Sequence, residues 1–424
     1  MSLDAELLHK AVAQLHGSSV HHDLRQRAVE DLLTQGFPTT RDEHWKYSDC
    51  SPLLASLGAR LYHDSHPVDD VEMARLVDVE SYTLHFVDGV WDKERSDLPA
   101  GITVTSYTET TDLFAPDEES VLSQGFTSLN GALASGGVMV DVAEGLSLDR
   151  PLAMMHSSSG KVAHVRHQVR VGQASEVVLI EHFSGEGAHS GLTNVVTALH
   201  LSEGARVAHY RLQQEGLLQA HIGRLAVKQQ RDSHYCSHLL TLGAAWSRVD
   251  VVISLADIGA NCQLNGLYLL SGRQHGDHHI QIDHLAPHCQ SDTHYRGVLD
   301  GRARAVFNGK VVVHKGAVKS HSTQSNANLL LSANAEVDTK PELEIYNDDV
   351  KCAHGSTTGR LDQQQLFYLQ SRGLSESEAR QLLTLAFVGE VMTRMNEPAL
   401  RAYVQKGCFA KLPHPLDMNM EGFL

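Results

Sequence analysis

Apolar residues near the N-terminus recur at the spacing of an α-helix. Leu8, Val12 and Leu15 fall on one face, and a Gly-Ser-Ser stretch then interrupts the pattern. The same spacing resumes after this break and continues to Gly36. We therefore expect residues 1–80 to form an N-terminal helical domain.

The pattern changes at about residue 81. Short runs rich in Val, Leu, Ile and aromatic residues now alternate with glycine-containing or polar turns, which is typical of β-strands. No amphipathic helix of normal length is evident between 81 and 350, so a parallel sheet with helical crossovers is not expected. The clearest runs are Thr83–Gly89, Glu176–Phe183, Val195–Leu201, Val207–Leu212 and Val249–Leu255.

A sandwich, a barrel and a β-solenoid all fit this pattern. Roughly 250 residues of short strands exceed a typical single sandwich, which favours a solenoid although no strict repeat length is visible. The open ends of a solenoid need covers, and the flanking helical segments are expected to cap them.

A helical pattern returns after Asp362, giving a C-terminal domain over residues 361–424. We expect a first short helix from Gln363 to Gln370, stopped at Gly373, and a second helix opened by the capping-box sequence that starts at Ser375. The second helix carries an apolar stripe that is most simply core: Leu382, Leu383, Ala386, Phe387, Val391 and Met392. A third helix is predicted to begin at Pro398 and end by Gly407, and the tail 412–424 is expected to be irregular.

The stretch 340–362 carries the most chemical information. Leu343 and Ile345 alternate with polar residues, as in a strand with one buried face. Pro341 suits the first position of such a strand or an edge, because it has no N–H to donate. After a turn at 347–349, Cys352 and His354 fall two positions apart, so a thiol and an imidazole are expected on the same side of the next strand, roughly 6.6 Å apart. These two groups could share one soft metal, or one could face a partner.

Composition narrows the class of protein. No run approaches the length of a membrane span, and the N-terminus has no basic, apolar signal-peptide pattern. Six cysteines without a CxxC pair in 424 residues predict reduced thiols in the cytoplasm. The net charge of −16 argues against binding to a nucleic-acid backbone.

Histidine is abundant, with 28 residues, and the densest group lies between 275 and 294. Imidazole and thiolate are zinc ligands, so a zinc metalloenzyme built on this group is the alternative hypothesis, although the spacing fits no common zinc signature. In a solenoid these side chains would instead stack on neighbouring coils or face solvent. Signatures of phosphate binding, of a nucleophile elbow and of dinucleotide binding are absent from the sequence. The residues of the group are His275, His278, His279, His284, His288, Cys289 and His294.

The run Glu336–Asp362 closely resembles the SufB/SufD family of iron–sulfur cluster assembly scaffolds, and Leu366–Ser375 continues the match. Thr39–Tyr47 also resembles an N-terminal motif of SufD-like chains, although we interpret its Trp and Tyr as packing the helical domain onto the next part of the chain. The resemblance implies a mainly β fold, with a right-handed parallel β-helix over 81–360 between two helical domains.

The resemblance also implies a function without turnover. It implies pairing with a SufB-like subunit at the C-terminal end of the β-helix, and docking of a SufC-like ABC-type ATPase on the C-terminal helices. The residues expected at the ATPase contact are Leu366, Phe367, Tyr368, Arg372 and Gly373. His354, with Cys352 as a second candidate, would lie at the interface with the SufB-like subunit, and His354 would be a transient metal ligand.

No cofactor is expected on the isolated chain. A transient iron–sulfur cluster, and a flavin, are associated with the assembled complex in this family. The edge strands near 340–355 could also pair two copies of this chain when it is isolated. One difference from SufB-like chains indicates which branch of the family this chain resembles. The position that carries a cysteine in SufB-like chains is Ser325 here. A hydroxyl is a poor ligand for a soft metal and cannot relay sulfane sulfur, so the chain resembles the SufD-like branch.

Overall fold

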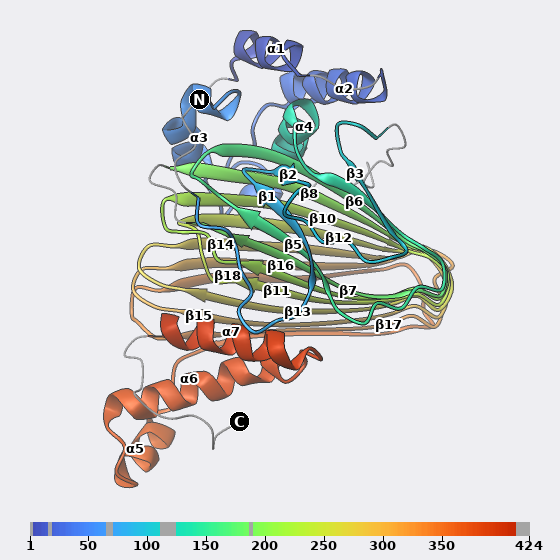
Figure 1. Cartoon of the computed structure of the whole chain (residues 1–424). Helices are drawn as coiled ribbons and strands as arrows, with labels where there is room; N and C mark the ends of the chain where they lie inside the picture. Colours follow the sequence, from blue (N-terminus) through green and yellow to red (C-terminus); the bar gives the residue numbers. More distant parts are fainter. Residues whose placement is uncertain (1–2, 16–18, 65–70, 111–123, 186–189, 413–424) are drawn as a thin grey trace.

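The computed structural model describes residues 3–15, 19–64, 71–110, 124–185 and 190–412. Its body is a rod of stacked parallel strands arranged in two sheets, with helices on either side (Figure 1). The predicted mainly β fold, a parallel β-helix flanked by N-terminal and C-terminal helices, is confirmed.

Each coil of the rod contributes one strand to each sheet. The ten-stranded sheet runs in the order β19-β17-β15-β13-β11-β9-β7-β5-β1-β2, and the nine-stranded sheet in the order β18-β16-β14-β12-β10-β8-β6-β4-β3. All pairs are parallel except β1 with β2 and β3 with β4, which are antiparallel and lie at the N-terminal end of the rod. The ten-stranded sheet comprises β1 (Tyr82–Val87), β2 (Val90–Asp92), β5 (Leu152–Ser157), β7 (Glu176–Ser184), β9 (Arg206–Gln213), β11 (His234–Thr241), β13 (Asn261–Leu270), β15 (Gln290–Leu299), β17 (His321–Leu330) and β19 (Lys351–Gly359). The nine-stranded sheet comprises β3 (Ile102–Ser106), β4 (Val138–Val142), β6 (Val162–Val171), β8 (Gly191–Leu201), β10 (Gln219–Gln229), β12 (Trp246–Leu255), β14 (His275–His284), β16 (Arg304–Val313) and β18 (Glu336–Ile345).

The coils differ in length, which explains why the sequence shows no strict repeat. Trp246 pairs with His275 and His275 with Arg304, 29 positions further along in each case. By contrast, Ala220 pairs with Trp246 after 26 positions, and Arg304 pairs with Glu336 after 32. The extra residues lie in the turns, so the strands stay in register while the repeat changes.

The strands from β5 to β13 are largely buried on both faces, because helices cover the outer faces of the two sheets, whereas β18 and β19 are partly or fully exposed. Between the sheets, side chains at alternate positions form an apolar core, to which β12 contributes Val249, Val251 and Ile253. Glycines in the left-handed conformation, such as Gly204 and Gly259 with φ of +66° and +75°, make the tight turns between coils.

The N-terminal helices cover the outer face of the nine-stranded sheet. They are α1 (Ala5–Ala13), α2 (Ser19–Gln35) and α3 (Ser51–Leu57), with 3-10 turns η1 (Glu43–Trp45) and η2 (Gly58–Leu61). A further helix, α4 (Gln124–Leu133), packs between α2 and strands β6 and β8. The expectation that no helix interrupts the 81–350 region was therefore wrong. In α4 the apolar residues Phe126, Leu129 and Leu133 face the helices and the sheet, so its pattern is not that of a strand.

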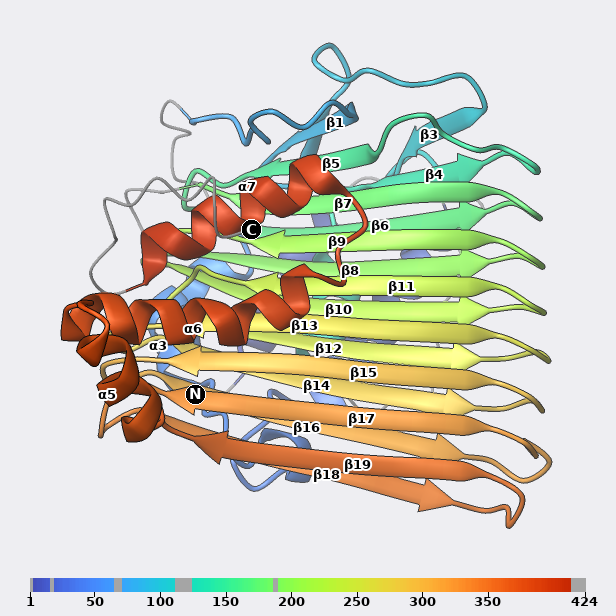
Figure 2. The ribbon, with the colours of Figure 1, turned by 90° about the horizontal axis from the view of Figure 1, so that it is seen from below.

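The C-terminal helices α5 (Gln363–Ser371), α6 (Glu376–Met392) and α7 (Pro398–Lys411) lie on the other side of the rod. Helices α6 and α7 cross the outer face of the ten-stranded sheet (Figure 2). The helical segments thus cover the flat faces, whereas the sequence led us to expect them over the ends of the rod. No helix among the described residues is long and apolar enough to cross a bilayer.

Two details of these helices differ from expectation. Helix α7 does not end by Gly407 but continues to Lys411, and a Cβ at Gly407 would lie 3.2 Å from the side-chain nitrogen of Gln214. In α6 the predicted stripe is partly rotated: Val391 and Met392 are buried, but Ala386 is exposed. The capping box of Ser375 with Glu378 is present as predicted.

Candidate functional site

The last coil leaves both sheets with a free edge at the same end of the rod. Strand β19 is the terminal strand of the ten-stranded sheet and pairs only with β17, and β18 is the terminal strand of the other sheet and pairs only with β16. Among the described residues no further strand continues either sheet. This open end, formed by β18 and β19, presents unpaired backbone N–H and C=O groups along two edges.

Cys352 and His354 both lie on the inner column of β19. They pair in register with Ser322 and Gln324 of β17, which are buried between the sheets. The alternation of a strand therefore turns Cys352 and His354 toward the interior, as the sequence predicted for a shared side. His354 is nevertheless exposed, since no coil among the described residues continues beyond it to cover it.

Cys352 is half-buried and packs against the apolar core of the rod. Burial raises the pKa of its thiol, only partly offset by a backbone hydrogen bond from Ser322. At neutral pH the group is therefore a neutral thiol, which binds metals and reacts less readily than a thiolate. His354 is the more accessible ligand of the two.

The opposite strand of the open end, β18, has mainly apolar side chains on its inner face and charged ones on its outer face. Leu343 packs against the core, while Ile345 near the rim is 42% exposed. On the outer face, Lys340 bonds to Glu43 and to Glu342, and Asp338 and Glu344 pair with Arg304 and Lys310 of β16. Of the two positions predicted for Pro341, the edge strand is correct, because β18 is the last strand of its sheet. The first position of the strand is wrong, because Pro341 lies in the middle of β18.

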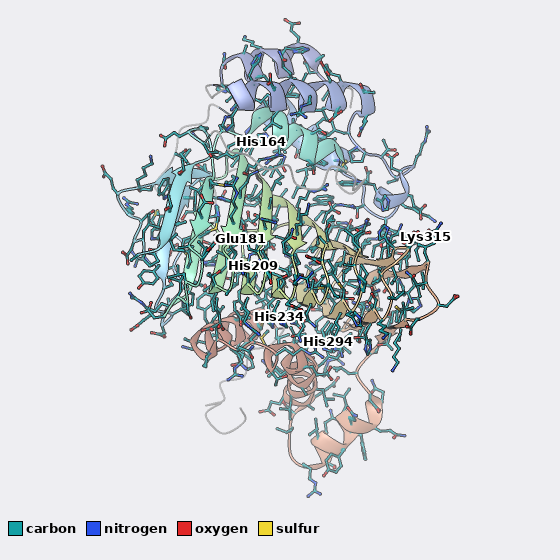
Figure 3. All side chains as sticks on the ribbon, turned by 90° about the vertical axis from the view of Figure 1, so that its right-hand side faces the viewer. His164, Glu181, His209, His234, His294 and Lys315 are labelled. Carbon is teal, nitrogen blue, oxygen red and sulfur yellow. The ribbon has the colours of Figure 1, made fainter. Side chains whose placement is uncertain are left out.

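The histidines between 275 and 294 do not form a metal site. His278 and His284 face the interior, where they bond to Thr241 and Ser291. His275 and His279 lie on the outer face of the nine-stranded sheet near the N-terminal segment, whereas His294 faces the C-terminal helices (Figure 3). Within the described ranges, no three His, Cys, Asp or Glu side chains are placed to hold a metal ion. The predicted zinc site is therefore not supported.

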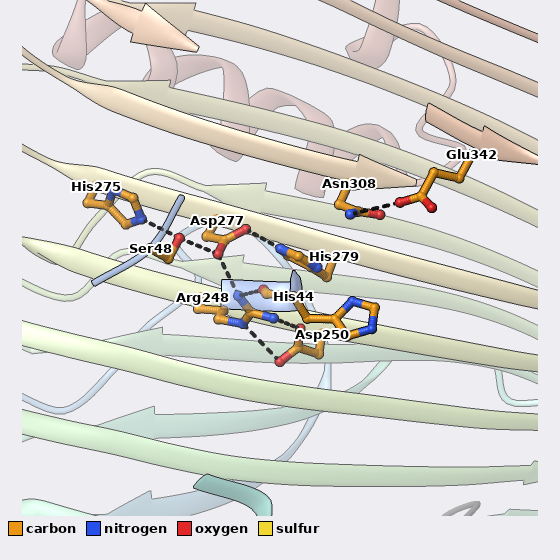
Figure 4. A network of polar contacts seen from close by, with 9 residues as sticks. All are labelled: His44, Ser48, Arg248, Asp250, His275, Asp277, His279, Asn308 and Glu342. Carbon is orange, nitrogen blue, oxygen red and sulfur yellow. Dashed lines mark hydrogen bonds and ion pairs between the residues drawn. The ribbon is translucent and has the colours of Figure 1, made fainter. Parts of the chain in front are cut away.

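The outer face of the nine-stranded sheet carries a buried ionic cluster that was not expected from the sequence. Arg248 bonds to Asp250 and to Asp277 at 2.8 Å each, and all three side chains are fully buried (Figure 4). Burial alone would raise the pKa of Asp277, but His279 and Arg248 together hold it well below its usual range. The only sequence signal is the alternation Arg248-x-Asp250, since Asp277 lies one coil further along.

The N-terminal segment is fixed by this cluster. Arg248 donates a hydrogen bond to the carbonyl of His44, its guanidinium lies 3.9 Å from the Trp45 ring centre, and Ser48 donates to Asp277. Trp45 also stacks on Trp246. The interpretation that the aromatic residues of this motif pack the helical domain onto the β body is confirmed for Trp45.

The residues expected at the ATPase contact lie on and just after α5. Leu366 is buried, but Phe367 and Tyr368 are 72% and 56% exposed, and the Arg372 guanidinium lies 5.2 Å from the Tyr368 ring centre. Gly373 adopts φ +99° and ends the helix, as predicted. Two adjacent exposed aromatic rings on a short helix are typical of a surface that binds another protein.

Ser325 does not belong to the open end. It lies on the outer face of β17, where its hydroxyl accepts a hydrogen bond from Arg296 at 3.4 Å. Arg296 also pairs with Glu390 of α6. The hydroxyl thus contributes to the contact between the sheet and the C-terminal helices.

Comparison with known proteins agrees with this architecture. Residues 154–387 match the family model described as SUF system FeS cluster assembly, SufBD core domain, and residues 7–154 match the SufBD protein N-terminal region. The chain belongs to the SufBD family.

Relatives of this SufBD chain match over most of its length. It is 30% identical to the iron–sulfur cluster assembly protein SufD of Escherichia coli over 92% of both chains. It is also 30% identical to an iron–sulfur cluster assembly SufBD family protein of Synechocystis, over 90% of this chain and 89% of that one. A SufBD family protein of Mycobacterium leprae is 29% identical over 67% of this chain and 72% of that one. The SufBD chain is thus an iron–sulfur cluster assembly protein of the SUF system.

Proposed function

We propose that this chain is a non-enzymatic scaffold subunit, of the SufD-like branch, in a SufBCD-type complex. It pairs with a SufB-like subunit through the open end and binds a SufC-like ATPase through α5 and the other C-terminal helices. The observation that carries the proposal is the coincidence of two free sheet edges with an exposed, inward-facing imidazole at His354.

The edges suit a partner built in the same way. Each free edge offers alternating donors and acceptors at strand spacing, so a second rod can continue both sheets by main-chain hydrogen bonds. The inner faces of β18 and β19 would then be covered, and Ile345, Cys352 and His354 would be buried at the junction. Covering these groups stabilises the pair by removing apolar surface from water.

His354 would contribute a nitrogen ligand at this junction. An imidazole binds iron when it is neutral, and the cluster is cargo assembled between the subunits, not a resident cofactor. Cys352 lies two positions away on the same inner column, but as a half-buried neutral thiol it is the weaker candidate. The chain itself supplies geometry and one ligand, and the ATPase supplies the energy for conformational change.

Co-expression with SufB-like and SufC-like proteins tests the proposal. A tag on this chain should recover both partners, and the recovered complex should contain iron. His354→Ala should leave the complex intact but abolish its iron loading. His321→Ala, which changes an exposed histidine on the outer face of the neighbouring strand β17, should leave iron loading unchanged. Loss of iron in both variants, or in neither, would count against the role of His354.

The ATPase contact has its own test. Phe367→Ala with Tyr368→Ala removes the two exposed rings of α5 and should abolish recovery of the ATPase while the SufB-like subunit is still recovered. Leu33→Ala, which changes an exposed apolar residue on α2, is the matched control. Full recovery of the ATPase with the double variant would contradict this part of the proposal.

A further inference from the structure

The interior of the rod is not uniformly apolar. One side of it carries a line of inward-facing polar residues, which we call the polar seam, that runs from the second coil to the open end. All of its members except Thr339 are buried between the two sheets, as Glu181 and His209 are in Figure 3. They are His156, His167, Glu181, His209, Arg211, Tyr235, Thr241, Tyr268, His278, Thr293, Tyr295, Asn326, Asn328 and Thr339.

The upper part of the polar seam is a hydrogen-bonded ionic network. Glu181 accepts hydrogen bonds from Thr197 at 2.7 Å and from Arg211 at 3.1 Å, and pairs with His209 at 3.1 Å. His209 in turn bonds to the Tyr235 hydroxyl at 2.8 Å. Burial alone would raise the pKa of Glu181, but Arg211 and His209 outweigh it and keep the carboxylate ionised.

The lower part is a second network that reaches the last coil. The Tyr268 hydroxyl donates to Asn328, and Asn326 donates to Tyr268 at 3.0 Å. Thr339 of β18 donates to Asn326 at 3.1 Å. Since Thr339 is only partly buried, this network ends where the interior opens to solvent.

The sequence makes room for these large polar groups with glycines on the inner faces of the sheets. A Cβ at Gly266 would overlap the Tyr295 ring, and one at Gly297 would overlap the Tyr268 ring. A Cβ at Gly223 would come within 2.7 Å of the Arg211 guanidinium. The space in the polar seam is therefore provided by the backbone itself.

Six buried polar atoms of the polar seam have no hydrogen-bond partner among the described residues. They are Nε2 of His156, Nε2 of His167, Nε of Arg211, Nδ1 of His278, Oγ1 of Thr293 and Oη of Tyr295. For His167, the ring nitrogen that carries the hydrogen can be assigned. The Val138 N–H donates to its Nδ1 at 3.2 Å, and burial lowers the pKa of this imidazole to about 4, so at neutral pH Nε2 carries the hydrogen. It is a buried donor that requires an acceptor.

Four of these atoms, from His156, His167, Thr293 and Tyr295, lie in two groups. The rings of His156 and His167 are 5.0 Å apart, edge to face, and Phe86 and Phe183 stack on either side of His156. Thr293 and Tyr295 are two positions apart on the inner face of β15, so their side chains are neighbours. Each group brings two polar side chains together in the interior, as a site for a small hydrogen-bonding molecule requires.

We propose that ordered water molecules bind in the polar seam, one between His156 and His167 and one at Thr293 and Tyr295. The first accepts the hydrogen of His167 Nε2, and the second bridges the two hydroxyls. Both sites lie in the interior of the rod and do not depend on the proposed function.

Two measurements test it. A high-resolution crystal structure of the full chain should show a water peak within hydrogen-bond distance of Tyr295 Oη and another near His167 Nε2. In urea denaturation, Tyr295→Phe and Thr293→Val should leave the midpoint unchanged or lower it, because each removes a partner from a bound water. If these sites are dry, the same variants remove an unpaired buried hydroxyl and the midpoint should rise.

Tyr268→Phe is the control for the denaturation measurement. The Tyr268 hydroxyl is bonded to Asn326 and Asn328, so removing it should lower the urea midpoint. A raised midpoint for Tyr295→Phe, or a crystal structure with no density at either site, would overturn the proposal.

Discussion

The rings of Tyr268 and Tyr295 pass each other inside the rod, and each lies against a glycine of the other's strand. Tyr295 of β15 lies against Gly266 of β13, and Tyr268 of β13 lies against Gly297 of β15. Both hydroxyl-bearing rings are fully buried. This reciprocal arrangement fixes the two coils to one register, because a shift of either strand would bring a ring against a side chain.

Gly266→Ala should therefore destabilise the protein by about 1–3 kcal/mol, the usual cost of forcing an extra group into a packed interior. The free energy of unfolding, measured by urea denaturation, gives this value. Gly389→Ala in α6 is the control: no atom beyond its chain neighbours and its own helix backbone lies within 4 Å of the added methyl group, so the variant should gain about 0.5–1 kcal/mol from helix propensity. A Gly266→Ala protein as stable as the wild type would show that the rings can move apart.

Lys319 occupies the left-handed region with φ of +58°, in the turn between β16 and β17. A side chain costs roughly 1 kcal/mol in this conformation, and glycine removes the cost. We expect Lys319→Gly to raise stability by about 1 kcal/mol, less the extra chain entropy of glycine when unfolded. Lys315→Gly, in the same turn but without a positive φ, should not be stabilising. The thermal or urea unfolding midpoints of the two variants, each compared with the wild type, test this prediction. Equal changes in the two variants would contradict the strain argument.

Buried histidines should make the protein sensitive to mild acid. Burial lowers the pKa of His278 to about 4, and likewise that of His167 and His182. Each is neutral in the folded state but protonates near pH 6.5 once unfolded. The contribution of these histidines to the free energy of unfolding is thus fully present above about pH 6.5. It falls as the pH drops toward 4, by about 1.4 kcal/mol per pH unit for each such histidine. Urea denaturation at a series of pH values measures the slope. His278→Gln should make it shallower, and a slope unchanged by this variant would contradict the assignment.

The buried cluster under the N-terminal segment should be intolerant of losing its cation. Arg248→Met leaves two buried carboxylates, Asp250 and Asp277, without their partner, which costs about 3–5 kcal/mol. Arg304→Met on the same face removes a partly exposed pair with Asp338 and should cost less than about 1 kcal/mol. Urea denaturation measures the loss of unfolding free energy in each variant. If the two losses are equal, the cluster contributes no more to stability than a surface ion pair.

Local pattern was enough to predict much of this structure. The runs Glu176–Phe183 and Val249–Leu255 are strands, and Gly373 and the capping box at Ser375 end and begin helices as expected. These features depend on residues close together in the chain. The placement of Cys352 and His354 on one side of a strand is of the same kind.

The features that could not be predicted depend on contacts between distant segments. Arg248 meets Asp277 one coil later and His44 204 positions earlier, so no local spacing reveals the cluster. The unequal coil lengths conceal which residues stack. The inner face also carries polar groups, at Glu181 and Tyr295, where apolar residues are expected. The glycine opposite the Tyr295 ring explains how a group of that size fits.

The central claim is that the open end formed by β18 and β19 binds a sister subunit. Hydrogen–deuterium exchange of this chain, alone and in the complex with a SufB-like subunit, tests it most directly. Binding should slow amide exchange chiefly over residues 336–359, because free edge groups become paired, while β10 to β13 exchange at the same rate in both states. Protection elsewhere, with 336–359 unchanged, would contradict the claim.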